Sequence, residues 1–515
     1  MKSCITCICL VLPAASGVFG AAKGSVQSSA NNFFDAPRVH RIEIKIGLEE
    51  FNRLKANNRA YVAGIARVDD QEFADAGIRL KGRGSFKPLG DKPSFAIKFN
   101  QFVPGQKLFG LSKIMLNNAS QDSTYLSEYV ATGLFRDAKV PAARVAHARV
   151  SLNGRDLGIY VLIEAMNASF LEENFKTAKG NLYEGYARDL NERLEQDNGA
   201  AGDQSDLQQL VATARLPLDE RKQALARVLD VDECYSFLAM SMLIAQHDSY
   251  PLNRNNYRIY RRPETGRFTM IPHGIDGTFR ESNISITPPR RYVLTKALLE
   301  GDGASLYRER VANLFTNVFD MESVSNRIAR RAEILKAAAA SDEEKEQIQR
   351  RTANYLSRIQ LRHSRASEQL SETLTWLKIG PGEQTVLTGW RASSEGGECV
   401  LERRTLEGKP MLYVKSGEST AVASWRLRLL LAPGRYLFSG KAQTANAAPP
   451  NGASLRLYQL YDRPTRFVSN TRWHVLEHGK QVSPGSEEVE FICDVTGHGS
   501  EAWFDLESLT LTREF

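Results

Sequence analysis

The chain has 515 residues, of which 42% are hydrophobic and 25% are charged, and its formal net charge is +7. This length exceeds what one hydrophobic core usually organises, so we expect two or three domains. The ordinary composition excludes a largely disordered, collagen-like or polytopic membrane chain. The mild charge, with basic and acidic residues interleaved, argues against a nucleic-acid-binding protein.

The first 22 residues have the pattern of a cleavable signal peptide. Met1 and Lys2 precede the apolar run 4–20, and small residues follow at positions 20–22. The run is interrupted and too short for a membrane span, which needs about 20 apolar residues. We therefore expect a secreted, periplasmic or cell-surface protein without a transmembrane segment in the mature chain; the alternative is a disordered cytosolic N-terminus. Residues 23–36, rich in Ser, Asn and Ala, predict a flexible lead.

Three cysteines remain beyond the signal peptide: Cys234, Cys399 and Cys493. Cys234 lies in a helical pattern and is best explained as a core residue. A disulfide between Cys399 and Cys493 is one interpretation in an oxidising compartment, and two buried free thiols are the other. The sequence leaves both open.

Residues 37–376 alternate between strand and helix patterns, which predicts an α+β domain. Short alternating apolar segments at 39–46, 61–68, 76–82 and 94–99 predict strands, with a helix at 48–57 between the first two. A helix follows over 122–138. Two further strands then meet at Asn153-Gly154, a strong hairpin signal.

The second half of this domain is mainly helical. Residues 187–230 are polar before they turn helical, which predicts a surface insertion ahead of a buried helix at 231–246. Two strands around a turn at 264–266 follow, and 295–375 predicts a helical part. Residues 380–515 consist of short strands separated by Gly, Pro and Ser turns, which predicts a separate all-β sandwich or jelly roll.

Three side chains in the middle of the chain suggest phosphoryl transfer. Asp248 is followed five residues later by Asn253, and Asp276 lies beside a glycine further on. Phosphoryl transfer uses a carboxylate to orient the attacking hydroxyl, and an amide oxygen with a second carboxylate to hold magnesium on the nucleotide. Taken alone this spacing is weak, because Asp and Asn in loops usually cap helices or close turns.

Upstream, a glycine-flanked cationic turn contains Arg83 and Ser85, and backbone amides in such a turn can hold phosphates. Lys98 lies on a predicted strand between two apolar residues and faces the side opposite to theirs. It is either an exposed strand lysine or a cation with a phosphate or carboxylate partner. Glu164 ends another apolar strand, where it is either solvated or a buried counter-ion of Lys98.

These stretches occur together and in the order typical of the CotH kinase-like family (spore coat protein H). The matching segments are Arg79 to Ser85, Lys92 to Phe99, Asn153 to Glu164, Asn181 to Tyr183, Asp248 to Tyr257 and Pro272 to Phe279. The resemblance covers about residues 38–375 and does not extend to the sandwich. It implies a divergent protein-kinase-like fold that uses ATP and Mg²⁺, with Ser or Thr side chains of a protein substrate as acceptors.

By position, the resemblance implies a role for each candidate residue. Asp248 corresponds to the catalytic acid, Asn253 and Asp276 to magnesium ligands, and Asn256 to a residue that holds the loop. The nucleotide-binding candidates are Lys98 with Glu164 as its partner, and Arg83 and Ser85 in the phosphate turn.

One departure concerns the metal site. Many members of the family have two acids where this chain has Gly274 and Asp276, so the first acid is absent.

Two functions therefore follow from the sequence. The first is a secreted atypical protein kinase. The alternative is a non-catalytic, pseudokinase-type binding protein associated with the cell wall or with carbohydrate. The sandwich is expected to bind a polysaccharide through aromatic residues; the alternative is a purely structural or kinase-docking sandwich. Its candidates are Trp390, Tyr458, Tyr461, Trp473 and Trp503, of which Trp503 is expected in the core.

Overall fold

The computed structural model describes residues 23–82, 84–200, 202, 204–395, 398–417, 422–458, 466–468, 470, 472–485 and 487–515. The predicted signal peptide and Arg83 lie outside these residues. The chain divides into two compact units: residues up to 118 together with 145–176, and residues 119–144 together with 177–515. None of the described helices has the length and apolar character needed to cross a membrane.

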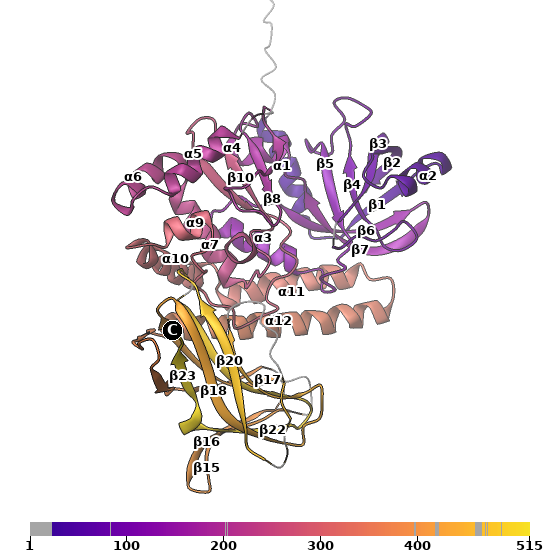
Figure 1. Ribbon diagram of the computed structural model, residues 1–515. Coiled ribbons are helices and arrows are strands. Elements are labelled where there is room, and N and C mark those ends of the chain that lie inside the picture. The colour runs from indigo at the N-terminus through magenta and orange to yellow at the C-terminus, as the bar shows by residue number, and fades with distance from the viewer. Residues whose placement is uncertain are drawn as a thin grey trace, which may run out of the picture. The chain divides into compact units, whose positions relative to one another are not determined.

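The first unit is a closed barrel in the order β1-β2-β3-β4-β5-β7-β6, drawn in indigo and purple in Figure 1. Its strands are β1 (His40–Lys45), β2 (Val62–Val68), β3 (Gln71–Lys81), β4 (Ser94–Lys98), β5 (Lys113–Asn117), β6 (Val145–Leu152) and β7 (Arg155–Glu164). Its helices are α1 (Lys23–Phe34), α2 (Leu48–Ala56) and α4 (Ala168–Phe175). The parallel pair β1 and β6 closes the barrel.

The alternating sequence pattern explains the barrel interior. Side chains at every second position, such as Ile44, Ile78, Ile97 and Leu162, are fully buried and belong to one core. The hairpin between β6 and β7 turns at Asn153 and Gly154, whose φ angles of 49° and 83° are both left-handed, as the favoured two-residue hairpin turn requires. The predicted strands and hairpin of this unit are confirmed.

The predicted flexible lead is wrong for most of its length, because residues 23–34 form α1. Ala30, Phe33 and Phe34 near the end of this helix are buried in the barrel core. His40 fixes the helix end, since its ring lies 4.1 Å from that of Phe33 and its Nε2 is 2.8 Å from the Phe33 carbonyl oxygen. The polar composition of residues 23–36 predicted a flexible segment, although Phe33 and Phe34 at its end pack into the core.

Asp69 holds the same His40 ring from the other side. One carboxylate oxygen of Asp69 lies 2.7 Å from His40 Nδ1 and 2.9 Å from the Arg38 guanidinium, and the other accepts the Arg41 backbone N–H at 2.8 Å. Burial raises the pKa of Asp69, but the hydrogen bonds from His40 and the Arg41 amide outweigh it, so the pKa is lowered overall.

A lowered carboxyl pKa stabilises the fold above the unfolded pKa of about 3.9, and this stabilisation is lost as the pH falls through the folded value. We therefore expect Asp69→Asn to speed amide hydrogen exchange in β1 and α1 at pH 6, with a difference from wild type that shrinks toward pH 3. The neighbouring exposed carboxylate supplies the control variant Asp70→Asn, which should behave as wild type. A difference that does not depend on pH would contradict this role of Asp69.

The second unit contains a small sheet in the order β11-β10-β8-β9 and a set of helices. The strands are β8 (Leu182–Gly185), β9 (Glu195–Asn198), β10 (Tyr257–Arg261) and β11 (Phe268–Pro272). The helices are α3 (Ser127–Asp137), α5 (Ser205–Ala214), α6 (Leu218–Val228), α7 (Val231–Leu243), α8 (Tyr250–Asn253), α9 (Val293–Leu298), α10 (Gly303–Asn317), α11 (Met321–Ala337) and α12 (Asp342–Ser371). From Cys234 to Leu243, every residue of α7 is buried, which explains its continuous apolar sequence.

Residues 187–230 are more than the predicted surface insertion. β9 pairs with β8, and Leu207 and Leu210 of α5 are buried. Asp206 accepts hydrogen bonds from the Asn181 side chain at 2.8 Å and from the Tyr183 hydroxyl at 2.7 Å. The segment is therefore tied into the unit through two residues that belong to one of the motifs found in the sequence.

Residues from Trp376 onward form two sheets that share one core, so the predicted sandwich is confirmed, while its jelly-roll connectivity stays a prediction. One sheet contains β12 (Trp376–Leu377), β14 (Arg391–Glu395), β17 (Val422–Leu431), β19 (Gly452–Tyr458) and β21 (Glu488–Thr496). The other contains β13 (Gln384–Val386), β15 (Val400–Leu406), β16 (Lys409–Lys415), β18 (Gly434–Ala445), β20 (His474–Val482), β22 (Glu501–Asp505) and β23 (Thr510–Arg513).

None of the cysteines among the described residues forms a disulfide. Cys493 is buried in the sandwich core, where burial raises the pKa of its thiol, and Cys399 packs against that core. Of the two interpretations that the sequence left open, the structure has two thiols without a disulfide, of which Cys493 is buried and Cys399 is half-buried.

Candidate functional site

The segment that carries Asp248 leaves α7 through a sharp turn. Ala245 has a left-handed φ of 49°, an uncommon conformation for alanine. The single-turn helix α8 then begins after Ser249, whose carbonyl accepts the Asn253 N–H at 2.7 Å. This turn places Asp248 and Asn253 on the same side of the loop.

Three asparagine side chains hold the Asp248 carboxylate. Asn253 Nδ2 donates to Oδ1 at 2.8 Å, and Asn256 Nδ2 donates to Oδ2 at 3.2 Å. Asn255 Nδ2 lies 3.0 Å from both oxygens. The carboxylate is therefore fixed in orientation by the loop that follows it, and all four side chains are half-buried and reach solvent.

Asn256 also connects this loop to the segment of Asp276. Its Nδ2 donates to the Gly274 carbonyl at 2.9 Å, and Gln246 Nε2 lies 3.3 Å from the same oxygen. Gly274 has a left-handed φ of 58°, and a Cβ there would lie 2.9 Å from Asn256 Oδ1. Asn256 approaches position 274 so closely that glycine, which stands here in place of the family acid, is the residue that fits.

Asp276 is half-buried two residues further on. The segment is anchored after it by Phe279, which is buried, has a φ of 57° and donates its N–H to the Ile244 carbonyl at 3.0 Å. Left-handed residues at 245, 254, 256, 274 and 279 all border this site. Such conformations cost energy and gather at functional sites, where the surrounding structure holds them.

Three residues close to Asp248 in the sequence have buried polar atoms that find no hydrogen-bond partner among the described residues. Within the described part of the chain, Gln246 Oε1, His247 Nδ1 and Ser249 Oγ are buried without a hydrogen-bond partner, and such atoms are uncommon in native proteins. The described residues hold no cluster of three or more His, Cys, Asp or Glu side chains. The predicted magnesium ligands, Asn253 and Asp276, offer instead one amide and one carboxylate, both of the oxygen type that Mg²⁺ prefers.

The first unit contains the predicted phosphate turn. Gly82 has a φ of 103°, its carbonyl accepts a hydrogen bond from Arg59 at 2.6 Å, and the Ser85 carbonyl accepts one from Asn118 at 3.3 Å. Lys81 comes directly before this turn and donates to Asn117 Oδ1 on β5. Arg83, the other predicted turn residue, lies outside the described residues.

Lys98 and Glu164 are not placed as predicted. Lys98 is opposite Lys113, whereas Glu164 is opposite Ile114, the next residue of β5. Successive side chains of a strand point to opposite faces, so Lys98 and Glu164 lie on different faces of the barrel sheet and do not form a pair. Glu164 is buried, on the face of the core residue Ile114.

Lys98 is also far from the phosphate turn. It lies opposite Gly77, four residues before Lys81 on β3, and this corresponds to roughly 13 Å along a strand. Its Nζ lies 6.0 Å from the centre of the Tyr61 ring. Lys81, on the same sheet face and next to the turn, is the better candidate for a phosphate contact.

The predicted sugar-binding aromatics of the sandwich differ in exposure. Trp390 is buried, with its indole N–H bonded to the Leu387 carbonyl at 3.0 Å, so it is a core residue. Trp503, expected in the core, is half-buried and lies 5.1 Å from the Tyr413 ring, and Trp473 is half-buried. The Tyr458 side chain and Tyr461 lie outside the described residues.

The barrel and the helical part together make this a mixed α/β protein. The family model described as "CotH kinase protein" matches residues 78–377. Because this match covers more than half of the chain, the protein belongs to the CotH kinase family, as the sequence motifs predicted.

A curated relative is the inner spore coat protein H of Bacillus subtilis (strain 168). It is 26% identical over 220 residues, which cover 39% of this chain and 59% of the relative. The chain therefore matches less than two thirds of that protein.

Two solved structures are also similar. The proinflammatory kinase CtkA of Helicobacter pylori is 14% identical with a TM-score of 0.27, over 53% of this chain and 94% of that one. The CBM22-1 xylan-binding domain of Paenibacillus barcinonensis Xyn10C is 11% identical with a TM-score of 0.22, over 26% and 97%. Both TM-scores are low.

The structure adds residues that the sequence analysis missed. Asn255 contacts both oxygens of Asp248, and Lys81 with Asn117 borders the phosphate turn. The two successive asparagines at 255–256 were a sequence signal that could have pointed to Asn255. Asn256 was expected to hold the loop, and it does.

Proposed function

We propose that the protein is an atypical kinase that transfers the γ-phosphate of ATP to Ser or Thr side chains of a protein substrate. The observation that carries this proposal is the Asp248 carboxylate, which three asparagine amides hold in one orientation. A carboxylate offers about four acceptor sites. The three amides make four contacts with the two oxygens, so the hydroxyl of an acceptor side chain would take the place of one of the two contacts that Asn255 makes.

The residues around Asp248 fit the division of work in phosphoryl transfer. Asp248 would orient the acceptor hydroxyl and take up its proton. Asn253 turns its Nδ2 toward Asp248, so its amide oxygen points elsewhere and is a candidate magnesium ligand together with Asp276. Mg²⁺, when bound, neutralises charge on the transferring phosphate.

The replacement of one family acid by Gly274 supports the alternative, a non-catalytic protein with the same fold. Purified protein incubated with γ-labelled ATP and Mg²⁺ separates the two functions. We expect phosphate incorporation into the protein itself or an added Ser/Thr-containing acceptor, and a higher melting temperature with Mg²⁺-ATP. A protein that shows neither property is the non-catalytic one. Export through residues 1–22, and polysaccharide binding through Trp473 in the sandwich, are further parts of this proposal.

Two variants test which lysine contacts the nucleotide phosphates. We expect Lys81→Met to weaken Mg²⁺-ATP binding about tenfold or more, since a charge-assisted hydrogen bond contributes about 1.5–3 kcal/mol. Lys98→Met, on the same sheet face but far from the turn, is the matched control and should bind as wild type. Calorimetric titration measures both, and a loss confined to Lys98→Met would restore the assignment made from the sequence.

A further inference from the structure

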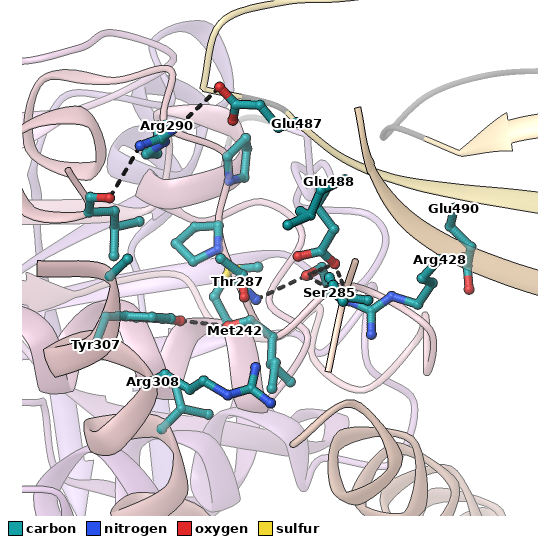
Figure 2. Close-up of a pocket in the computed structure, with 18 of the residues that line it drawn as sticks. Met242, Ser285, Thr287, Arg290, Tyr307, Arg308, Arg428, Glu487, Glu488 and Glu490 are labelled. Atoms are coloured by element: carbon teal, nitrogen blue, oxygen red, sulfur yellow. Dashed lines mark hydrogen bonds and ion pairs between the residues drawn. The ribbon is translucent and has the colours of Figure 1, made fainter. Parts of the chain in front are cut away.

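A cavity lies in the second unit, where the helical part meets the sandwich (Figure 2). Its volume is about 520 Å³, within the range of ligand pockets, roughly 300–1,000 Å³. It is lined by the segment 283–291, helix α10, residues 372–374 with Trp376 of β12, and residues of the strands β17 and β21. We call it the junction cavity.

The walls of the junction cavity are largely apolar. The apolar lining includes Met242, Leu252, Ile284, Ile286, Val311 and Leu430. Trp376 also lines the cavity, and it is 55% exposed, although tryptophan usually buries most of its surface. An exposed indole at the wall of an apolar cavity is a surface on which a flat ring can stack.

The charged groups of the cavity already have partners. Arg428 is paired with Glu488 and, at 2.9 Å, with Glu372, and Ser285 also donates to Glu488 at 2.7 Å (Figure 2). Arg290 pairs with Glu487 at 3.0 Å. A charged ligand would have to break these pairs and leave a charge without its partner, which is costly. The cavity is therefore suited to an uncharged ligand.

Arg308, the remaining labelled cation in Figure 2, points to the end of α12. It donates to the carbonyls of Leu370 at 2.6 Å and Glu372 at 3.0 Å. Its positive charge therefore stabilises the C-terminus of α12, where the helix dipole favours cations. This contact fixes the chain that leads to Trp376.

The floor of the cavity is continuous with the Asp248 loop. Met242, Leu252 and Ile284 of the cavity form one buried cluster with Ala245. Leu252 directly precedes Asn253, which holds Asp248, and the Leu252 carbonyl accepts the Tyr292 hydroxyl at 3.1 Å. A ligand that packs on this floor would therefore restrict the loop.

A buried arginine makes this floor rigid from below. Arg362 of α12 is fully buried and donates to the carbonyls of Met242 at 2.7 Å, Leu243 at 2.9 Å and Ile284 at 2.6 Å. The end of α7 and the segment after Ser282 are thus held by one side chain. A packing change at the cavity floor passes to the residues just before Asp248.

We propose that the junction cavity binds an uncharged, apolar small molecule flat enough to stack on Trp376, and that its occupancy orders the loop of Asp248. The binding half of this proposal is independent of the proposed kinase function. Only the consequence, a change in phosphoryl transfer on binding, rests on that function.

The experiment uses the full chain without nucleotide and the uncharged dye Nile red as probe. We expect saturable dye binding with one site per chain. Ala304→Trp, which places a large side chain from α10 into the cavity, and Trp376→Ala should each weaken it about tenfold or more. Ser305→Trp adds the same ring at the neighbouring exposed position of α10, which does not line the cavity, and should bind as wild type.

Hydrogen exchange over residues 244–256 tests the coupling, and it should slow when the dye is bound. Unchanged exchange in the dye-bound protein would overturn the coupling. Dye binding in Ala304→Trp equal to wild type, or no saturable binding in wild type, would overturn the site. Displacement of the dye by a neutral xylo-oligosaccharide would overturn the apolar assignment in favour of a sugar. None of these measurements uses ATP, so they test the cavity even if the proposed kinase function is wrong.

Discussion

Asp248→Asn is expected to keep Mg²⁺-ATP binding and to lose about 100-fold or more of the phosphate transfer, the contribution typical of a positioned acid or base. The substitution preserves size but removes the charge that would orient the acceptor hydroxyl. Measuring nucleotide affinity by calorimetry and transfer with labelled ATP on the same sample separates the two effects.

A second variant distinguishes chemistry from loop structure. In Asn255→Ala, Asp248 keeps its charge and loses one of its three amide donors. We expect a smaller loss of transfer than in Asp248→Asn, with nucleotide affinity unchanged. Equal loss of binding and transfer in Asp248→Asn would mean that Asp248 supports the loop and does not act on the acceptor.

The elements of this fold that the sequence predicted are those with strong local patterns. Strand β1 alternates between buried and more exposed residues, β7 is a nearly continuous apolar run, and the β6–β7 hairpin has Asn-Gly at its turn. Local sequence alone predicted these elements. Helix α1 was missed because its polar composition resembles a lead segment. Only tertiary contacts, with Phe33 and Phe34 in the barrel core, explain why it is ordered.

The candidate site divides in the same way. Asp248 lies two residues before the single-turn helix α8 and Asn253 ends that helix, so the local chain brings the two side chains within 2.8 Å of each other. The pairing of Lys98 with Glu164 depended instead on the register of three strands. The alternation along β4 predicts that Lys98 points to the face opposite to its apolar neighbours. Only the registers of β4 and β7 with β5 show that Glu164 lies on the other face.

Gly274 shows how the site adapts to a missing acid. A side chain here would need a left-handed backbone and would meet Asn256 Oδ1 at 2.9 Å. Asn256 holds both Asp248 and the Gly274 carbonyl. Its side chain therefore lies where the side chain of an acid at position 274 would begin. It follows that Asp276 is the remaining acid of this segment for a metal.

Asp276→Ala is accordingly expected to abolish the magnesium dependence of nucleotide binding while the protein stays folded. Asp276 is half-buried, so an alanine at this position opens no large cavity in an apolar core. Without it, the amide oxygen of Asn253 is the single predicted ligand, and Mg²⁺ is usually held by one or two carboxylates in addition to phosphate oxygens. Titration of ATP at increasing Mg²⁺ concentrations should show a strong dependence in wild type and none in the variant.

The control for this variant is Glu264→Ala, which removes an exposed acid at the turn of the same β10–β11 hairpin, at the end away from Asp276. It should bind Mg²⁺-ATP as wild type does. Melting temperatures of both variants within a few degrees of wild type would show that the fold is intact. Magnesium-dependent binding that survives in Asp276→Ala would remove this residue from the metal site, because the segment then holds no other acid in the position that the family uses.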